Sequence, residues 1–256
     1  MTTFAKSMSE TKTMTKRNLW KSLSNPDRLI ENVIAPIMTM LVFVFVLGGA
    51  MSQSTDIRYV NYIVPGALVL CIGQCSSATA AGISADIQKG IIDRFRSMPI
   101  SSTSVLNGHV FESTIRTFFS VILIFIVALL VGFQPNASLS AWLATLGILL
   151  LFTFTITWIS VAYGLLMKGP EGASSLTMFV MLFTYLSSGF IPTTTLPSFL
   201  RVFAENQPMT PIVETIRRLM LAQPLDNHLF LTIIWCSFLL IGAFIMAMKL
   251  YRRKVK

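Results

Sequence analysis

The side chains able to do chemistry in this 256-residue chain fall into a few closely spaced groups. Glu112 and Arg116 lie four residues apart, and Glu214 precedes Arg217 by three. On a helix, both spacings bring the carboxylate and the guanidinium to the same face. We therefore favour a local ion pair in each group. For Glu112 and Arg116 a proton relay or a substrate contact remains the alternative, because ionisable groups at membrane depth are candidate functional residues.

Motifs of enzyme active sites are missing. The sequence has no G-x-x-x-x-G-K-[ST] phosphate loop, no H-E-x-x-H, no G-x-S-x-G and no C-x-x-C. His109 and His228 lie far apart and are not expected to share a site. Cys71 and Cys75 share a helix face and a metal pair there is conceivable, but small packing residues are the favoured interpretation. We expect no enzyme, and no cofactor or metal bound by this chain.

Apolar runs of membrane-spanning length must position these groups. Hydrophobic residues make up 54% of the chain and charged residues 12%, against about 25% charged in soluble proteins. A span needs roughly 20 apolar residues. These runs should be helices, because a helix pairs its own backbone groups and unpaired groups are costly in lipid. The sequence predicts an all-α polytopic membrane protein with six transmembrane helices: Val33–Ala50, Val60–Ser84, Val105–Val131, Ala141–Met167, Leu176–Phe190 and Leu229–Met248.

Basic residues account for the net charge of +9, and they fall on alternate sides of these spans. One side receives the basic residues of segment 1–32, Lys89, Arg94, Arg96, Lys168 and the C-terminal cluster; the other has Arg58, Arg201, Arg217 and Arg218. The positive-inside rule places both termini in the cytoplasm. The charge then reflects topology and contact with anionic membrane lipid, and nucleic acid is not an expected partner.

The segments outside the spans divide the chain further. Residues 1–32 are predicted to form a cytoplasmic tail with an amphipathic interfacial helix at Met14–Ser24, ahead of the six-span domain 33–249 and a basic cytoplasmic tail 250–256. The region 191–221 is rich in proline and too charged to span. It predicts short re-entrant helices before the last span, carrying Pro208, Pro211, Glu214 and Arg217; a structured external loop is the alternative.

A short polar stretch at about 86–101, between the second and third spans, predicts a helix on the cytoplasmic surface. Ile91, Phe95 and Met98 recur at helical spacing and form one apolar face. The charged residues Asp93, Arg94 and Arg96 lie around it, and Pro99 ends the helix. A simple interfacial loop anchored by Phe95 is the alternative.

Two segments resemble the ABC exporter permeases of the type-2 class, and most closely those of the daunorubicin-resistance type. The first is Asp86 to Leu106, DIQKGIIDRFRSMPISSTSVL. The second is Leu186 to Leu221, in which the positions that match the pattern of the class are Leu186, Ser187, Gly189, Leu196, Pro197, Pro208, Met209 and Arg217. Together with the six spans, the resemblance covers essentially the whole chain.

The resemblance implies a permease subunit in the bacterial plasma membrane. Two copies of a separate ATPase subunit would use ATP and Mg, and a second permease subunit would complete a homodimer or heterodimer. The stretch Ile91–Met98 would be the coupling helix docked on the ATPase. We expect export of an amphipathic drug, antibiotic or lipid-like molecule. Export of a polysaccharide or lipid-linked glycan, an ATP-independent secondary carrier and a non-transporting scaffold are the alternatives.

Overall fold

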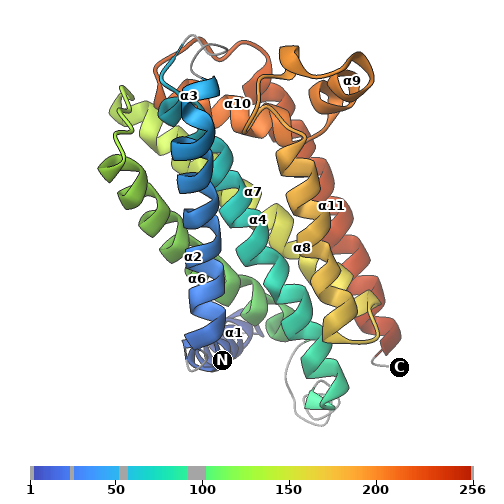
Figure 1. Ribbon diagram of the computed structural model, residues 1–256. Coiled ribbons are helices and arrows are strands. Elements are labelled where there is room, and N and C mark those ends of the chain that lie inside the picture. Colours follow the sequence, from blue (N-terminus) through green and yellow to red (C-terminus); the bar gives the residue numbers. More distant parts are fainter. Residues whose placement is uncertain (1–2, 24–25, 52–56, 92–101, 255–256) are drawn as a thin grey trace.

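The computed structural model describes residues 3–23, 26–51, 57–91 and 102–254, and every regular element in these ranges is a helix. Figure 1 shows a bundle of long helices, with short helices gathered at one end. In chain order the elements are α1 (Thr3–Leu23), α2 (Pro26–Val42), the π-helical turn η1 (Phe43–Leu47), α3 (Gly48–Met51), α4 (Tyr59–Gln88), α6 (Ser102–Leu130), α7 (Leu139–Leu166), α8 (Pro170–Tyr185), the 3-10 turn η2 (Thr193–Thr195), α9 (Ser198–Asn206), α10 (Met209–Met220) and α11 (His228–Lys254).

Four helices in the described part of the chain are long and apolar enough to cross a membrane: Tyr59–Gln88, Thr103–Leu130, Leu139–Leu166 and His228–Lys254. These correspond to the second, third, fourth and sixth predicted spans. The all-α, multi-pass membrane class is therefore confirmed. The predicted first and fifth spans are also helical, in α2 and α8, but neither meets the same criteria of length and hydropathy.

Helix α4 lies at the centre of the bundle, between α2 and α6 on one side and α7 and α8 on the other (Figure 1). The most apolar stretch of α4 is 94% buried, whereas those of α6 and α7 are 39% buried and that of α11 only 17%. The main core is built around α4 by side chains such as Leu68, Ile72, Ile124, Phe152 and Ile212. The outer helices consequently present the large exposed apolar side chains.

Small residues let the backbones around α4 approach closely, as membrane helices require. A Cβ atom added to Gly66 of α4 would collide with the backbone of Gly189, just beyond α8. A Cβ added to Gly164 of α7 would lie 2.5 Å from the carbonyl oxygen of Ala80. These two contacts bring α8 and α7 against opposite ends of α4.

Three predicted limits differ from the structure. The fifth apolar run predicts a span at Leu176–Phe190, but α8 begins at Pro170, since proline suits a first helical position, and ends at Tyr185 in a turn. Helix α11 continues to Lys254, so most of the predicted tail 250–256 forms its last turn, where cations are favourable. Helix α1 begins at Thr3 and includes the polar residues before Met14.

The region 191–221 forms η2, α9 and α10, at the end of the bundle opposite α1 (Figure 1). Helix α9 is mostly exposed, with Ala204 as its buried residue. Helix α10 is mostly buried and packs against α4, α7 and α11. Pro208 caps α10 and Pro211 lies in its first turn, where a missing backbone donor is tolerated.

Candidate functional site

The predicted coupling helix falls largely outside the described residues. Asp93, Arg94, Phe95, Arg96 and Met98 are all in segment 92–101, and only Ile91 is described, as the residue after a turn at Lys89–Gly90. Residues 86–88, at the start of the predicted stretch 86–101, are the last turn of α4. The turn at Lys89–Gly90 and Ile91 connect this end of the central helix to segment 92–101.

Asp86, in this last turn of α4, is the centre of a charged junction. Its Oδ2 atom lies 3.2 Å from Nη2 of Arg17 in α1 and 3.5 Å from Nε2 of His109 in α6. The Asp86 side chain is only 2% exposed, and a buried carboxylate needs such partners. The junction ties α1 and α6 to the end of α4 that leads into segment 92–101.

Sequence reasoning missed this junction. Asp86 and Arg17 are 69 positions apart in the chain, so no helical spacing connects them. The available signal was Asp86 itself, an acidic residue at the end of a long apolar run. Such a residue needs a cation nearby, but the sequence does not identify which one.

Helix α1 is also held by a close contact with α6. A Cβ added to Gly108 of α6 would lie 2.5 Å from Cβ of Met14 and 3.2 Å from the Met14 carbonyl carbon. Met14 and Asn18 are buried, whereas Trp20 on the same helix is 73% exposed. Helix α1 thus has one face packed on α6, and its Trp20 side chain is mostly exposed.

Glu112 and Arg116 form a local ion pair, with Nε of Arg116 2.9 Å from Oε1 of Glu112. Both side chains are less than a tenth exposed. Arg116 also donates from Nη1 to the carbonyl oxygen of Cys75, at 2.9 Å, and from Nη2 to Oγ1 of Thr79, at 3.4 Å. The guanidinium therefore joins α6 to α4. This geometry fits the local pairing, and a role of the pair in transport stays a prediction.

The thiols of Cys71 and Cys75 are both buried in α4, with their Sγ atoms 3.9 Å apart. Within the described ranges, no group of three or more His, Cys, Asp or Glu side chains is arranged to hold a metal ion. Both cysteines belong to the main core, and the backbone carbonyl of Cys75 accepts a hydrogen bond from Arg116.

A second buried arginine lies near the opposite end of α4. Arg217 of α10 pairs with Glu214 one turn earlier. Its Nε donates to the carbonyl oxygen of Tyr62, at 3.1 Å, and its Nη2 to that of Ser188, at 2.6 Å. The guanidinium carbon also lies 3.7 Å from the centre of the Tyr62 ring, a cation–π contact. Among the predicted residues of this region, Glu214 and Arg217 thus come together, while Pro208 and Pro211 position their helix.

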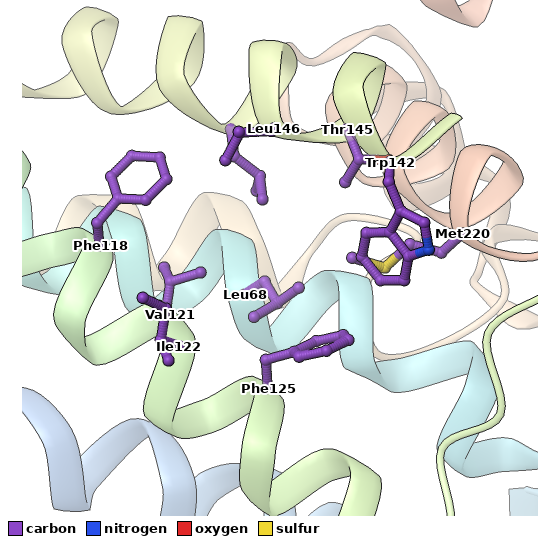
Figure 2. Close-up of a pocket in the computed structure, with 10 residues that line it drawn as sticks. Leu68, Phe118, Val121, Ile122, Phe125, Trp142, Thr145, Leu146 and Met220 are labelled. Atoms are coloured by element: carbon purple, nitrogen blue, oxygen red, sulfur yellow. The ribbon is translucent and has the colours of Figure 1, made fainter. Parts of the chain in front are cut away.

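An apolar pocket of about 200 Å³ lies between α6 and α7, with α4 as its floor. Figure 2 shows Phe118, Val121 and Phe125 of α6 facing Trp142 and Leu146 of α7, with Leu68 of α4 and Met220 at the end of α10 completing the lining. Pockets for drug-sized ligands enclose roughly 300 Å³ or more. This pocket alone is therefore too small to hold such a molecule.

Comparison with known proteins connects this geometry to a family. The profile of the ABC-2 type transporter family matches residues 9–221, which run from α1 through α10. This chain belongs to the ABC-2 type transporter family. The predicted class, a permease subunit whose ATPase resides on a partner protein, is confirmed by this match and by the relatives below.

Several curated permeases are similar to this ABC-2 family member. The daunorubicin resistance ABC transporter permease protein DrrB1 of Streptomyces coeruleorubidus is 28% identical, over 80% of this chain and 74% of that protein. The probable doxorubicin resistance ABC transporter permease protein DrrC of Mycobacterium tuberculosis is 20% identical, over 90% of this chain and 83% of that protein. The putative transport permease ycf38 of Porphyra purpurea is 25% identical, over 75% of this chain and 67% of that protein.

Proposed function

We propose that this chain is the membrane-spanning subunit of an ATP-driven exporter that moves an amphipathic drug, antibiotic or lipid-like molecule out of a bacterial cell. The observation that carries the proposal is its membership of the ABC-2 family together with relatives named for resistance to daunorubicin and doxorubicin. Both names refer to drugs, which supports this cargo class over a polysaccharide or lipid-linked glycan.

We further propose that the chain crosses the membrane six times, with the runs that contain α2 and α8 as the two additional spans. Helix α2 continues through η1 and α3 as one helical run from Pro26 to Met51, and 26 residues rise about 39 Å, enough for a bilayer core of about 30 Å. The 16 residues of α8 rise only about 24 Å. The buried turn Ser187–Phe190 extends that crossing. In Figure 1 both runs extend between the same two ends of the bundle as α4.

Both termini would face the cytoplasm of the bacterial cell. The N-terminal helix α1 and the end of α11 lie at the same end of the bundle (Figure 1). The basic residues Arg252, Arg253 and Lys254 are in the last turn of α11. The positive-inside rule assigns that end to the cytoplasm, and α9 and α10 then belong to the outer side as re-entrant helices.

ATP hydrolysis on a partner would act on segment 92–101. In our proposal two ATPase subunits, using ATP and Mg, dock on the coupling helices of two permease subunits. The Asp86 junction supports this, since it ties α4 to α1 and α6 immediately before the segment. Any movement of the docking surface would then be felt by three helices together.

The decisive experiment is reconstitution of this chain with its ATPase in liposomes of anionic and neutral lipid. We expect ATP-dependent movement of daunorubicin across the bilayer, and ATP hydrolysis stimulated by the drug. A preparation lacking the ATPase is the control. Transport by that control, driven by a proton gradient alone, would refute the proposal in favour of a secondary carrier. A complex that hydrolyses ATP and moves a glycan but no drug would refute the cargo class.

A further inference from the structure

The contacts of Arg217 are unusual because its donors reach the backbones of two other elements. Nε binds the carbonyl of Tyr62 in α4, and Nη2 binds the carbonyl of Ser188 in the turn after α8. The Arg217 side chain is 4% exposed. A planar guanidinium presents its donors in a rigid fork, so it can hold two acceptors in fixed relative positions.

Both acceptors lie where a helical backbone has unused capacity. Ser188 follows the end of α8, where the last carbonyls have no partner within the helix and a cation is favourable. Tyr62 is in the first turn of α4, and its carbonyl oxygen has a second lone pair beside the one that faces the following turn of the helix. The guanidinium thus binds one oxygen beyond the end of α8 and one oxygen of α4 that can accept a second hydrogen bond.

Close packing surrounds this contact. Gly66, the residue directly after Pro65 in α4, lies against the backbone of Gly189. Tyr59 donates its hydroxyl to the carbonyl of Phe190, at 3.0 Å. The first two turns of α4 and the turn after α8 are therefore one packed unit, to which Arg217 joins α10.

We propose that Arg217 is a positioning residue that makes α10 move with α4 and with the end of α8 during transport. The proposal rests on the exporter function proposed above. Helix α4 is about 45 Å long, and its other end carries the Asp86 junction next to segment 92–101. A displacement produced there by the ATPase reaches α10 through the two carbonyl contacts of Arg217.

The test compares Arg217→Lys with Arg218→Lys. Lysine keeps the positive charge but lacks the fork, so it cannot hold both carbonyls with the same geometry. The matched control Arg218 lies beside Arg217, and its contacts with Glu214, Asp226 and the Pro224 carbonyl are all within its own segment. Buried apolar residues of α10, such as Ile212 and Ile216, keep the helix packed in both variants.

The first measurement is the amount of daunorubicin moved per ATP hydrolysed by the reconstituted complex. In Arg217→Lys we expect this ratio to fall about tenfold or more, the effect of losing a charge-assisted hydrogen bond. ATP hydrolysis itself should stay within about twofold, because its site is distant. Arg218→Lys should retain the wild-type ratio. Equal ratios in both variants, or a parallel loss of ATP hydrolysis in Arg217→Lys, would overturn the proposal.

The second measurement needs nucleotide but no cargo. A cysteine placed at exposed Gln223, just beyond α10, is labelled with a membrane-impermeant maleimide, with and without vanadate-trapped nucleotide. We expect the labelling rate to depend on nucleotide in the wild-type background and to lose that dependence in Arg217→Lys. If the wild-type complex moves no drug, the exporter function fails, while the labelling comparison still decides the role of Arg217. Unchanged nucleotide dependence in Arg217→Lys overturns that role.

Discussion

Arg116 occupies a position in which an isolated charge would be very costly. Its guanidinium meets a carboxylate, a backbone carbonyl and a hydroxyl, from Glu112, Cys75 and Thr79. In a buried pair, removal of one partner leaves an uncompensated charge and costs about 3–5 kcal/mol. We therefore expect the pair to stabilise the contact between α6 and α4.

Exchanging the two charges tests this interpretation at the level of single residues. Glu112→Arg and Arg116→Glu should each lower the thermal unfolding temperature of the purified chain strongly. The double variant restores the pair but removes the arginine that reaches Cys75 and Thr79, so we expect only partial recovery. Intrinsic fluorescence during heating in detergent measures the effect.

The exposed pair Arg201 and Glu205 in α9 provides a matched control. It has the same chemistry and a spacing of four residues, but both side chains are more than 40% exposed. Exposed pairs contribute about 0–1 kcal/mol, so Glu205→Gln should leave the unfolding temperature nearly unchanged. Full recovery in the exchanged Glu112 and Arg116 variant would show that the contacts with α4 contribute nothing.

The sequence predicts the local pairs at this scale but not the long-range ones. The spacing in the sequence is enough to predict that Glu112 pairs with Arg116 and that Glu214 pairs with Arg217, because the two members of each pair lie on one helix. Arg217 and Tyr62, however, are 155 positions apart. Their contact depends on the packing of α10 against α4, and no periodicity in the sequence encodes that packing.

At the scale of elements, the contacts that hold α1 include a glycine contact with α6 and the charged junction at Asp86. The absence of a side chain at Gly108 lets the backbone of α1 at Met14 rest on α6. Asp86 adds the ion pair to Arg17. Because α1 is not among the helices long and apolar enough to cross a membrane, we expect these contacts to help keep it docked on the bundle.

Gly108→Val should release α1. The added methyl groups would overlap Met14, and overpacking costs about 1–3 kcal/mol. We expect trypsin to cut at Lys12, Lys16 and Arg17 about tenfold faster or more, since cleavage follows the population of the opened state. Limited proteolysis followed by mass spectrometry of the fragments measures this rate.

Gly147→Val in α7 is the control, because nothing lies within 4 Å of a Cβ at Gly147. It should leave the digestion of α1 unaltered. Equal cleavage rates in the two valine variants would show that the Gly108 contact does not hold α1 in place.

Helix limits could be predicted well where an apolar run and a helix coincide. The predicted spans Val60–Ser84 and Val105–Val131 lie within a few residues of α4 and α6. The prediction was poorest for α8, where the apolar run begins at Leu176 although the helix starts at Pro170. The first turns of α8 carry Glu171 and Ser174, which are both exposed. Because these residues are polar, an apolar run cannot indicate that the helix already includes them.

At the scale of the whole molecule, burial and hydropathy run in opposite directions. The most apolar stretch of α4 has the lowest mean hydropathy among the four candidate spans, 1.5, and is the most buried, while that of α11 has the highest, 2.5, and is the least buried. The reason is physical: a helix surrounded by protein can carry serines and close-packed small residues, whereas a lipid-facing helix needs large apolar side chains. The exposed phenylalanines and isoleucines of α11 match that requirement.

Insertion experiments on truncated chains test this arrangement. We expect a chain that ends shortly after Gly90 to integrate α4 into microsomes or inverted vesicles inefficiently. A chain extended through α8 should integrate it well. Resistance to carbonate extraction measures integration, and the more hydrophobic α11, placed alone behind the same leader, is the control. Equal integration of α4 in the short and the extended chain would contradict this expectation.

The encasement of α4 has a consequence for biogenesis. The ribosome delivers this helix early, yet the neighbours that shield it, α7 and α8, are synthesised at least 50 residues later by their place in the chain. Until they arrive, we expect α4 to be held at the translocon or by a membrane chaperone, because polar side chains are unfavourable in lipid. Cells that lack such an insertase should therefore lose this permease to quality-control proteolysis before it ever meets its ATPase.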